Sequence, residues 1–150
     1  SMLPRISVTP QSATNPDDPF ATPFTVKNDG FLPLYDVKSE CAIRQVQLLQ
    51  INTPYVLTVV EPKAYGFRLI DPRFAASVLD PNSTIDMACP FQRVENKKVK
   101  NANIALIVSF RPSILPWLRQ EKFYPFVTGT DQITGQIHWF STGSVIKNPK

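Results

Sequence analysis

Hydrophobic and polar residues alternate over several short stretches of this chain, which is the pattern of β-strands with one buried face. Between Phe20 and Asn28 the inward positions are expected to be Phe20, Thr22, Phe24 and Val26. The clearest alternation lies between Leu34 and Val46, and its expected buried face holds Tyr35, Val37, Ser39, Cys41 and Ile43. The period of two therefore predicts at least two half-buried strands in the first third of the chain.

Two later stretches follow the same period. From Ser83 to Phe91 one face carries Ile85, Met87, Cys89 and Phe91. From Asn103 to Arg111 the buried side is expected to hold Ile104, Leu106, Val108 and Phe110. Ile107 falls on the opposite side of that strand, so we expect this second face to be partly covered as well.

Clusters of Pro, Asn, Asp and Gly separate these stretches and mark turns. They lie at Asn15–Pro19, Asn28–Gly30, Asp80–Asn82 and, as a hairpin loop, Thr130–Gly135. Further strands are expected at residues 6–8, 55–60, 66–70, 123–128 and 136–141, and residues 73–79 form either a strand or one helical turn. Seven to nine short, unequal antiparallel strands predict an all-β, immunoglobulin-like sandwich with Greek-key connections rather than a barrel.

Composition favours the same class of fold. The chain has 150 residues, about the size of one domain, with 15 Pro against 5 Gly. Proline deletes a backbone donor and clashes with the preceding turn, so it forbids long helices, and Pro54 ends a helical interpretation of Val46 to Leu57. We expect one domain over residues 1–150, in which Ser1-Met2 is typical of a cloning remnant and residues 143–150 form a frayed tail.

The net charge of +4 and the pI near 9.2 raise the question of a nucleic-acid partner. The most basic stretch, Arg93 to Lys100, alternates charge with Val and is typical of a solvated hairpin turn, whereas nucleic-acid sites gather Lys and Arg with aromatic residues on one face. No apolar run reaches the ~20 residues of a membrane-spanning helix, and no signal-peptide pattern is present. We expect neither nucleic-acid binding nor an integral membrane segment.

Cys41 and Cys89 are the only cysteines, and both fall on inward faces of predicted strands. If the two strands lie in opposite sheets, the pair can bridge the core, as the inter-sheet disulfide does in antibody domains. Such a bridge would add about 3–4 kcal/mol on the chain-entropy model. The alternative is two buried free thiols. The disulfide is the favoured interpretation, and it indicates an oxidising, extracytoplasmic compartment.

The sequence lacks the combinations of residues that a catalytic, metal or cofactor site needs. His138 is the single histidine, so catalytic triads and multi-His metal sites would all depend on it, and an outward-facing strand residue is the simpler interpretation. The five glycines form no phosphate-binding loop. Asp17-Asp18 lies in a proline-bounded turn, and the sequon Asn82-Ser83-Thr84 also suits a turn. We expect no catalytic residue, metal or cofactor.

The segment from Arg111 to Phe126 is the strongest candidate for an interaction site. Its loop carries Ile114, Leu115, Trp117, Leu118 and Arg119. Trp and Leu are mostly buried in proteins, so the favoured interpretation is a loop that closes the end of the sandwich. The alternative is an exposed patch for a partner, since Trp and Arg are enriched at interface hot spots.

Two segments support a family resemblance. PFTVKNDGFLPLYDV (Pro23–Val37) has an Asn-x-Gly turn after one strand and an Asp-Val start of the next, and LDPNSTIDMAC (Leu79–Cys89) has a proline-containing turn before a Thr-rich strand. Both resemble bacterial immunoglobulin-like adhesion and repeat domains of the CARDB and DUF11 type, over less than a fifth of the chain. The resemblance implies an extracytoplasmic spacer or binding module.

The resulting expectation is a non-enzymatic immunoglobulin-like module of a larger exported protein. It would act as a structural unit, or bind a protein partner or the rest of its parent chain. The alternative is a carbohydrate-binding sandwich that uses exposed aromatic residues such as Trp117, Tyr124 or Trp139. An exposed coplanar row of these rings would favour it, and burial of all three would exclude it. A small hydrolase would need His138 beside a nucleophile in a cleft, and nothing in the sequence indicates one.

Overall fold

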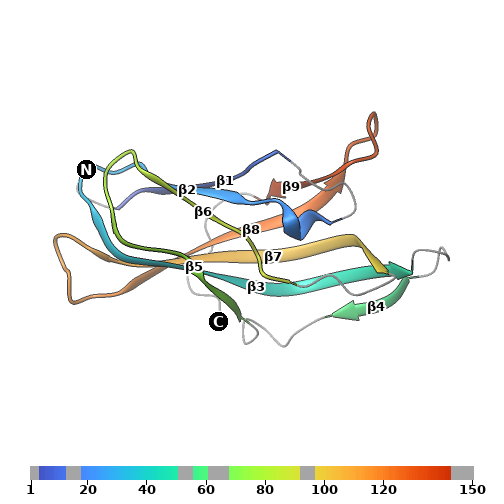
Figure 1. Ribbon diagram of the computed structural model, residues 1–150, viewed down its shortest axis with the longest axis horizontal. Coiled ribbons are helices and arrows are strands. Elements are labelled where there is room, and N and C mark those ends of the chain that lie inside the picture. The colour runs from blue at the N-terminus through green and yellow to red at the C-terminus, as the bar shows by residue number, and fades with distance from the viewer. Residues whose placement is uncertain (1–3, 13–17, 51–55, 61–67, 92–96, 143–150) are drawn as a thin grey trace.

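A computed structural model describes residues 4–12, 18–50, 56–60, 68–91 and 97–142 (Figure 1). Within these residues, nine strands and one 3-10 helix follow one another. They are β1 (Ile6–Pro10), η1 (Pro19–Ala21), β2 (Phe24–Asn28), β3 (Leu34–Gln50), β4 (Val56–Val60), β5 (Arg68–Leu79), β6 (Thr84–Met87), β7 (Lys97–Pro112), β8 (Gln120–Thr130) and β9 (Ile137–Ser141). The expected all-β class is confirmed.

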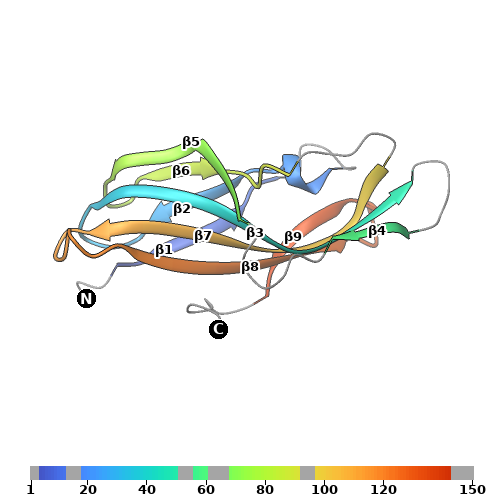
Figure 2. The same cartoon turned by 90° about the horizontal axis from the view of Figure 1, so that it is seen from below.

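The strands form two antiparallel sheets that pack face to face (Figure 2). The smaller sheet has the order β1-β2-β6, and the larger has the order β4-β3-β7-β8-β9. β5 also pairs with β3, along Leu34–Ala42, whereas β4 pairs with β3 along Val46–Leu49, so β4 and β5 share one edge of β3. The chain crosses between the sheets after β2, β5 and β6.

The core lies between the two sheets and is formed by the residues that the period of two places inward. Phe24 of β2 stacks at a tilt on Phe126 of β8, with ring centroids 4.9 Å apart. Every inward residue expected between Asn103 and Arg111 is fully buried. Burial of side chains of this size contributes about 1.5–3 kcal/mol each, which makes this layer the main source of stability.

A strand was expected from Phe20 to Asn28, but β2 covers only Phe24–Asn28. Buried and partly exposed residues still alternate along it, as the sequence predicts. Pro19–Ala21 forms a 3-10 helix, because Pro fits its first position and Asp18 caps it by accepting a hydrogen bond from the Phe20 amide at 3.1 Å. The ring of Phe20 still reaches the core, where it lies 5.6 Å from Trp139.

One inward assignment is wrong: the side chain of Tyr35 is exposed. The next residue, Asp36, has a φ of 50°, and the pairing of β3 with β7 shifts register between Tyr35 and Lys38. This bulge adds a residue on one strand and reverses the alternation, so Leu34 and Val37 both point inward. A second shift between Ile43 and Gln45 moves the buried set to Val46 and Leu48.

Residues 73–79 form a strand rather than a helical turn, as part of β5. Lys38 pairs with Ala75 and Glu40 with Ile70, so Asp71–Phe74 bulges out of the ladder opposite Ser39. The Ser39 hydroxyl donates to the Phe74 carbonyl at 2.9 Å and holds this bulge against β3.

The outer face of the larger sheet is covered more completely than the sequence indicates. Ala42, Ala105, Ile107 and Phe123 form a second, buried cluster there. The guanidinium of Arg68 lies 5.7 Å from the centre of the Phe123 ring and pairs with Glu40 and Glu121 at 3.3 and 3.1 Å. Its flat, weakly hydrated charge suits this position over an aromatic ring.

Three side chains of β8 and β9 fasten the N-terminal part of the chain to the larger sheet. Lys122 donates to the Pro4 carbonyl at 2.7 Å, and the Tyr124 hydroxyl donates to the Ile6 carbonyl at 2.9 Å. The indole N–H of Trp139 donates to the Pro19 carbonyl at 2.8 Å. These bonds give donors to the Pro4 and Ile6 carbonyls and add a second donor to the Pro19 carbonyl, which also accepts from the Thr22 amide at 3.1 Å.

Several sequence-based expectations fall outside the described residues. They concern Ser1-Met2, most of the turn at residues 15–19, the first residues of the strands at 55–60 and 66–70, the first half of the basic stretch at 93–100, and the tail at 143–150. In the part of the chain that is described, the long apolar helix that a membrane span requires does not occur.

Candidate functional site

The loop between β7 and β8 projects apolar side chains into solvent at one end of the sandwich. Two tight turns shape it: the Leu115 amide donates to the Pro112 carbonyl at 3.2 Å, and the Leu118 amide donates to the Leu115 carbonyl at 3.0 Å. With its backbone bonded to itself, the loop directs its side chains outward, and Trp117 is 77% exposed. The interpretation of this loop as a plug in the end of the core is therefore wrong.

A second loop lies beside it. The Ser113 hydroxyl donates to the Pro33 carbonyl, which ties the β7–β8 loop to the β2–β3 loop. Phe31, which is 78% exposed, stands in that second loop and lines a hollow of about 10 Å³ together with Ile114. We call the exposed apolar residues at this end the tip patch; they are Phe31, Ile114, Leu115, Trp117 and Leu118.

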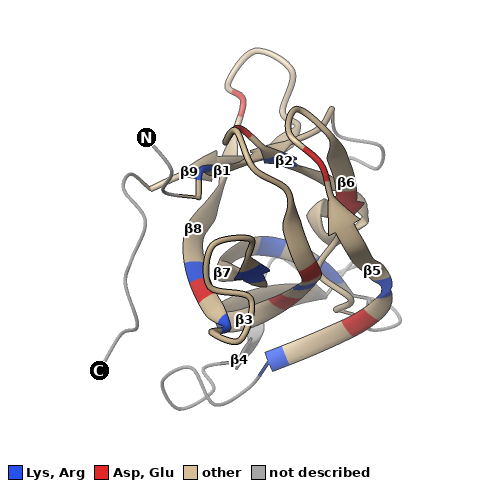
Figure 3. Ribbon diagram, turned by 90° about the vertical axis from the view of Figure 1, so that its left-hand side faces the viewer, with Lys and Arg blue, Asp and Glu red and all other residues tan. Residues whose placement is uncertain are grey.

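Basic and acidic residues lie close together on the strands and turns at this end of the molecule (Figure 3). The Asp36 carboxylate forms ion pairs with Arg111 at 3.3 Å and with Lys38 at 3.9 Å, and it accepts a hydrogen bond from Arg119. Arg119 also donates to the Asp36 carbonyl at 3.1 Å and to the Ser109 hydroxyl at 3.0 Å. Arg119 was expected to contact a partner, and these bonds show that it also holds the β7–β8 loop to β3.

The ring row expected for a carbohydrate site does not form. Trp117 is exposed, but Tyr124 and Trp139 are buried in the core on β8 and β9. Their polar atoms are bonded to backbone carbonyls of the N-terminal segment. Two of the three rings are therefore unable to stack on a sugar.

Phe31 belongs to the tip patch although sequence reasoning did not single it out. The only local signal is an aromatic residue directly after the turn at Asn28–Gly30, where polar residues are usual. Its place beside Ile114 depends on two loops, more than eighty positions apart along the chain, meeting at the same end of the sandwich.

The two cysteines form a disulfide, as the sequence predicts. Cys41 of β3 and Cys89, just beyond β6, have Cα atoms 5.3 Å apart, within the range that a disulfide spans. The bond joins the larger sheet to the chain leaving the smaller one, and both residues are buried. It closes a sequence separation of 48 residues.

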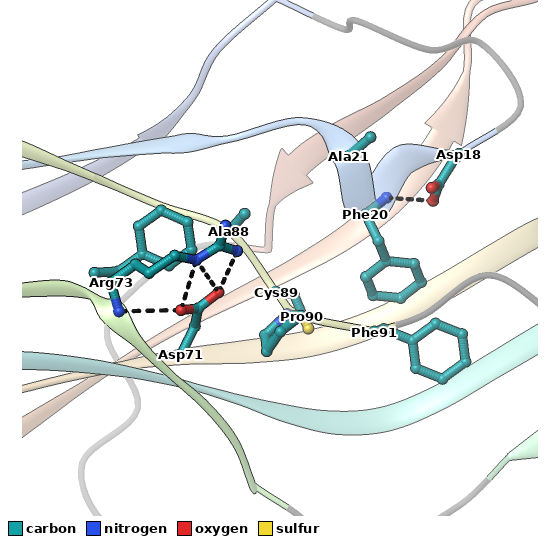
Figure 4. Close-up of a pocket in the computed structure, with 10 residues that line it drawn as sticks. Asp18, Phe20, Ala21, Asp71, Arg73, Ala88, Cys89, Pro90 and Phe91 are labelled. Atoms are coloured by element: carbon teal, nitrogen blue, oxygen red, sulfur yellow. Dashed lines mark hydrogen bonds and ion pairs between the residues drawn. The ribbon is translucent and has the colours of Figure 1, made fainter.

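An open groove of about 650 Å³ lies beside the disulfide (Figure 4). The bulge of β5 supplies Asp71 and Arg73 to one side of it, and the segment around η1 supplies Phe20 to the other. Hydrogen bonds from Arg73, the shortest at 2.6 Å, lower the pKa of the Asp71 carboxyl. The Asp71 and Arg73 charges offset each other here, and Asp18, which also lines the groove, accepts a hydrogen bond from the Phe20 amide.

Two further titratable residues, Asp131 and His138, lie in and beside the β8–β9 turn. Asp131 accepts hydrogen bonds from the amides of Ile133 and Thr134 at 2.8 and 3.4 Å, which lower the pKa of its carboxyl and cap the β8–β9 turn. His138 stands opposite Gly129 in the β8–β9 ladder. Within the residues that can be described, no group of three or more His, Cys, Asp or Glu is placed to hold a metal ion.

No family model, curated protein or solved structure matches this chain.

Proposed function

We propose that this chain is a non-enzymatic, immunoglobulin-like module of an exported protein, and that it presents the tip patch to a binding partner. The proposal combines a rigid scaffold with one exposed contact surface. Its immunoglobulin-like character is inferred from the two antiparallel sheets, the crossings after β2, β5 and β6, and a disulfide between the layers.

The Cys41–Cys89 bond is the observation that carries the proposal. Disulfides persist in oxidising compartments and are rare where thioredoxin and glutathione keep thiols reduced. The two thiols are buried and have each other as partner, so the bond serves stability rather than redox chemistry. A stable, cross-linked sandwich suits a module exposed to the outside of the cell.

The tip patch supports the interaction part of the proposal. Soluble proteins rarely leave several large apolar side chains together in solvent without a partner. Trp117 and Phe31 are the most exposed of its members, and the turns of the β7–β8 loop hold its backbone in place without a partner. A prearranged patch loses less entropy on binding than a flexible one.

Alkylation under denaturing conditions tests the exported-module proposal. We expect Cys41 and Cys89 to resist alkylation in unfolded, unreduced protein isolated from its own cell, and to take two labels after reduction, as measured by intact mass. Reduction should also lower the melting temperature, because the bridge restricts the unfolded chain. The matched control is the Cys41→Ala, Cys89→Ala variant, whose melting temperature should not respond to reductant.

The alkylation experiment has two outcomes, one for an exported module and one for an intracellular scaffold. A protein whose thiols alkylate without reductant would be an intracellular scaffold, and the exported-module proposal would be wrong. Two labels that appear only after reduction support it.

A further inference from the structure

We propose that the tip patch docks on an anionic lipid surface, with the sandwich standing on the bilayer by this end. The inference rests on the proposed function, since it names the partner of the same surface. In Figures 1 and 2 the β7–β8 loop lies at one end of the long axis, so the two long strands β3 and β7 would point away from the membrane.

The composition of the patch fits the membrane interface. Trp concentrates where headgroups meet hydrocarbon, because its aromatic body carries a polar N–H. Phe and Leu are common on the apolar faces of elements that lie in the same zone. The patch offers both, at Trp117 and Phe31, together with three aliphatic side chains of the β7–β8 loop. Peripheral apolar elements enter this zone to about 5–10 Å, which matches side chains rather than whole strands.

The charges at the base of the patch supply the second signal. Arg111, Lys38 and Arg119 share the single carboxylate of Asp36, so three cations on one anion leave two positive charges in excess. Near the end of β2, Lys27 forms an ion pair at 3.7 Å with Asp29 of the β2–β3 loop, so these two charges offset each other. Basic residues just behind an apolar tip meet anionic headgroups while the apolar side chains enter the interface.

The shape of the patch favours a bilayer over a protein partner. Interface hot spots between proteins are large side chains that fill pockets, and hot spots on one partner tend to pair with those on the other. Here the hollow between the two loops is only about 10 Å³, and the side chains protrude instead. A fluid interface receives protruding side chains without a preformed pocket.

A second copy of the chain is also a poor partner. Two tips that meet about a two-fold axis would bring the arginines of both copies, Arg111 and Arg119, next to each other. Like charges in apposition oppose such a contact. An anionic lipid surface would instead attract these arginines.

The tryptophans provide a direct readout. The chain has two, Trp117 in the tip patch and Trp139 in the core, where it is 4% exposed. We expect the intact protein to co-sediment with vesicles of equimolar phosphatidylcholine and phosphatidylglycerol, and its tryptophan emission to shift to shorter wavelength. Binding to phosphatidylcholine alone should be at least about tenfold weaker, and added salt should weaken binding to the mixed vesicles.

Matched variants locate the contact. Trp117→Glu should abolish both co-sedimentation and the emission shift. Ile133→Glu makes a similar change at the other end of β8, at a side chain that is 94% exposed, and should bind like the wild type. Lys38→Gln should weaken binding to the mixed vesicles about fivefold, as expected for one cation near the surface. Unchanged melting temperatures would show that all three variants fold.

Four results would overturn the inference. They are equal binding of the wild type and Trp117→Glu, equal binding to the two kinds of vesicle, an emission shift with protein concentration in the absence of vesicles, and no binding at all. The third would assign the tip to a second copy, with a dimer mass in light scattering. The fourth, with the disulfide intact by alkylation, would leave the exported module standing and assign the tip to a protein partner.

Discussion

At the scale of single residues, Tyr124 shows how one side chain closes an edge of the sandwich. Its ring is buried in the core, and its hydroxyl donates to the Ile6 carbonyl of β1 at 2.9 Å. Burial, with a smaller effect from the Asp29 carboxylate, raises the pKa of the Tyr124 hydroxyl above its ordinary value. The neutral phenol is therefore the form that the folded protein selects.

We expect Tyr124→Phe to lower the free energy of unfolding by about 1 kcal/mol at neutral pH, because the Ile6 carbonyl loses its donor. A tyrosine with a raised folded-state pKa contributes stability that is complete below about pH 10 and is lost as the pH rises toward that pKa. The variant should therefore lose less stability than the wild type above about pH 10. Urea denaturation at neutral and alkaline pH measures both effects, and equal alkaline slopes would contradict the second.

At the scale of elements, the bulge at Asp36 sets which side chains of β3 face the core. Asp36 adopts a left-handed φ of 50°, which Asp and Asn tolerate better than most residues with a side chain. The same residue gathers Arg111, Lys38 and Arg119 around its carboxylate. Backbone geometry and charge at one position thus fix both the register of β3 and the base of the tip patch.

Substitutions at Asp36 separate these two roles. Asp36→Gly and Asp36→Ala both remove the carboxylate, but only Gly relaxes the left-handed backbone. We expect the Ala variant to be less stable than the Gly variant by about 1 kcal/mol, measured by chemical denaturation. Asp36→Asn keeps the tolerance for left-handed φ and should differ from the wild type mainly in salt dependence. A Gly variant less stable than the Ala variant would contradict this account.

The sequence predicts elements well where the period of two is uninterrupted. Phe24 and Val26 of β2 and the inward residues of the central part of β7 are as expected, because every second residue there is apolar and the residues between them, except Ile107, are polar or small. It fails at Tyr35, since an apolar residue next to a bulge gives no sign that the alternation reverses. The bulge in β5 was not predicted either, since two separate segments at residues 66–70 and 73–79 were expected where one strand forms.

The candidate site, too, could be predicted from the sequence only in part. The exposed loop could be found from composition, since Ile114, Leu115, Trp117 and Leu118 interrupt a region where polar residues are usual. Whether these side chains point into the core or into solvent depends on the backbone turns at Pro112–Leu118, which composition does not encode. The contribution of Phe31 depends on contact between distant loops and has no local signature.

At the scale of the whole molecule, fold class could be predicted but strand order could not. Turn spacing and proline content suffice to exclude a helical protein. The adjacency of β3 and β7, and the sharing of one edge of β3 by β4 and β5, arise from pairings between segments far apart in the chain. Such pairings are selected by the packing of complete faces rather than by any one segment.

The disulfide contributes to stability at this scale. We expect the Cys41→Ala, Cys89→Ala variant to lose about 3–4 kcal/mol of unfolding free energy, because the bond restricts a loop that spans 48 positions of the unfolded chain. Replacement of both residues by Ser should cost more, since two buried hydroxyls would need partners. Chemical denaturation measures both losses. A loss below about 1 kcal/mol for the Ala variant would show that the unfolded chain is already compact.

The same bond governs how the molecule would respond to a pulling force applied at its two ends. Chain between Cys41 and Cys89 cannot lengthen while the bond is intact, because tension passes directly from one sulfur to the other. With about 3.3–3.6 Å of contour per residue, the 48-residue separation withholds roughly 170 Å of extension. A module unfolded by tension would thus lengthen by only its outer segments, and β4, β5 and β6 would remain within the locked loop.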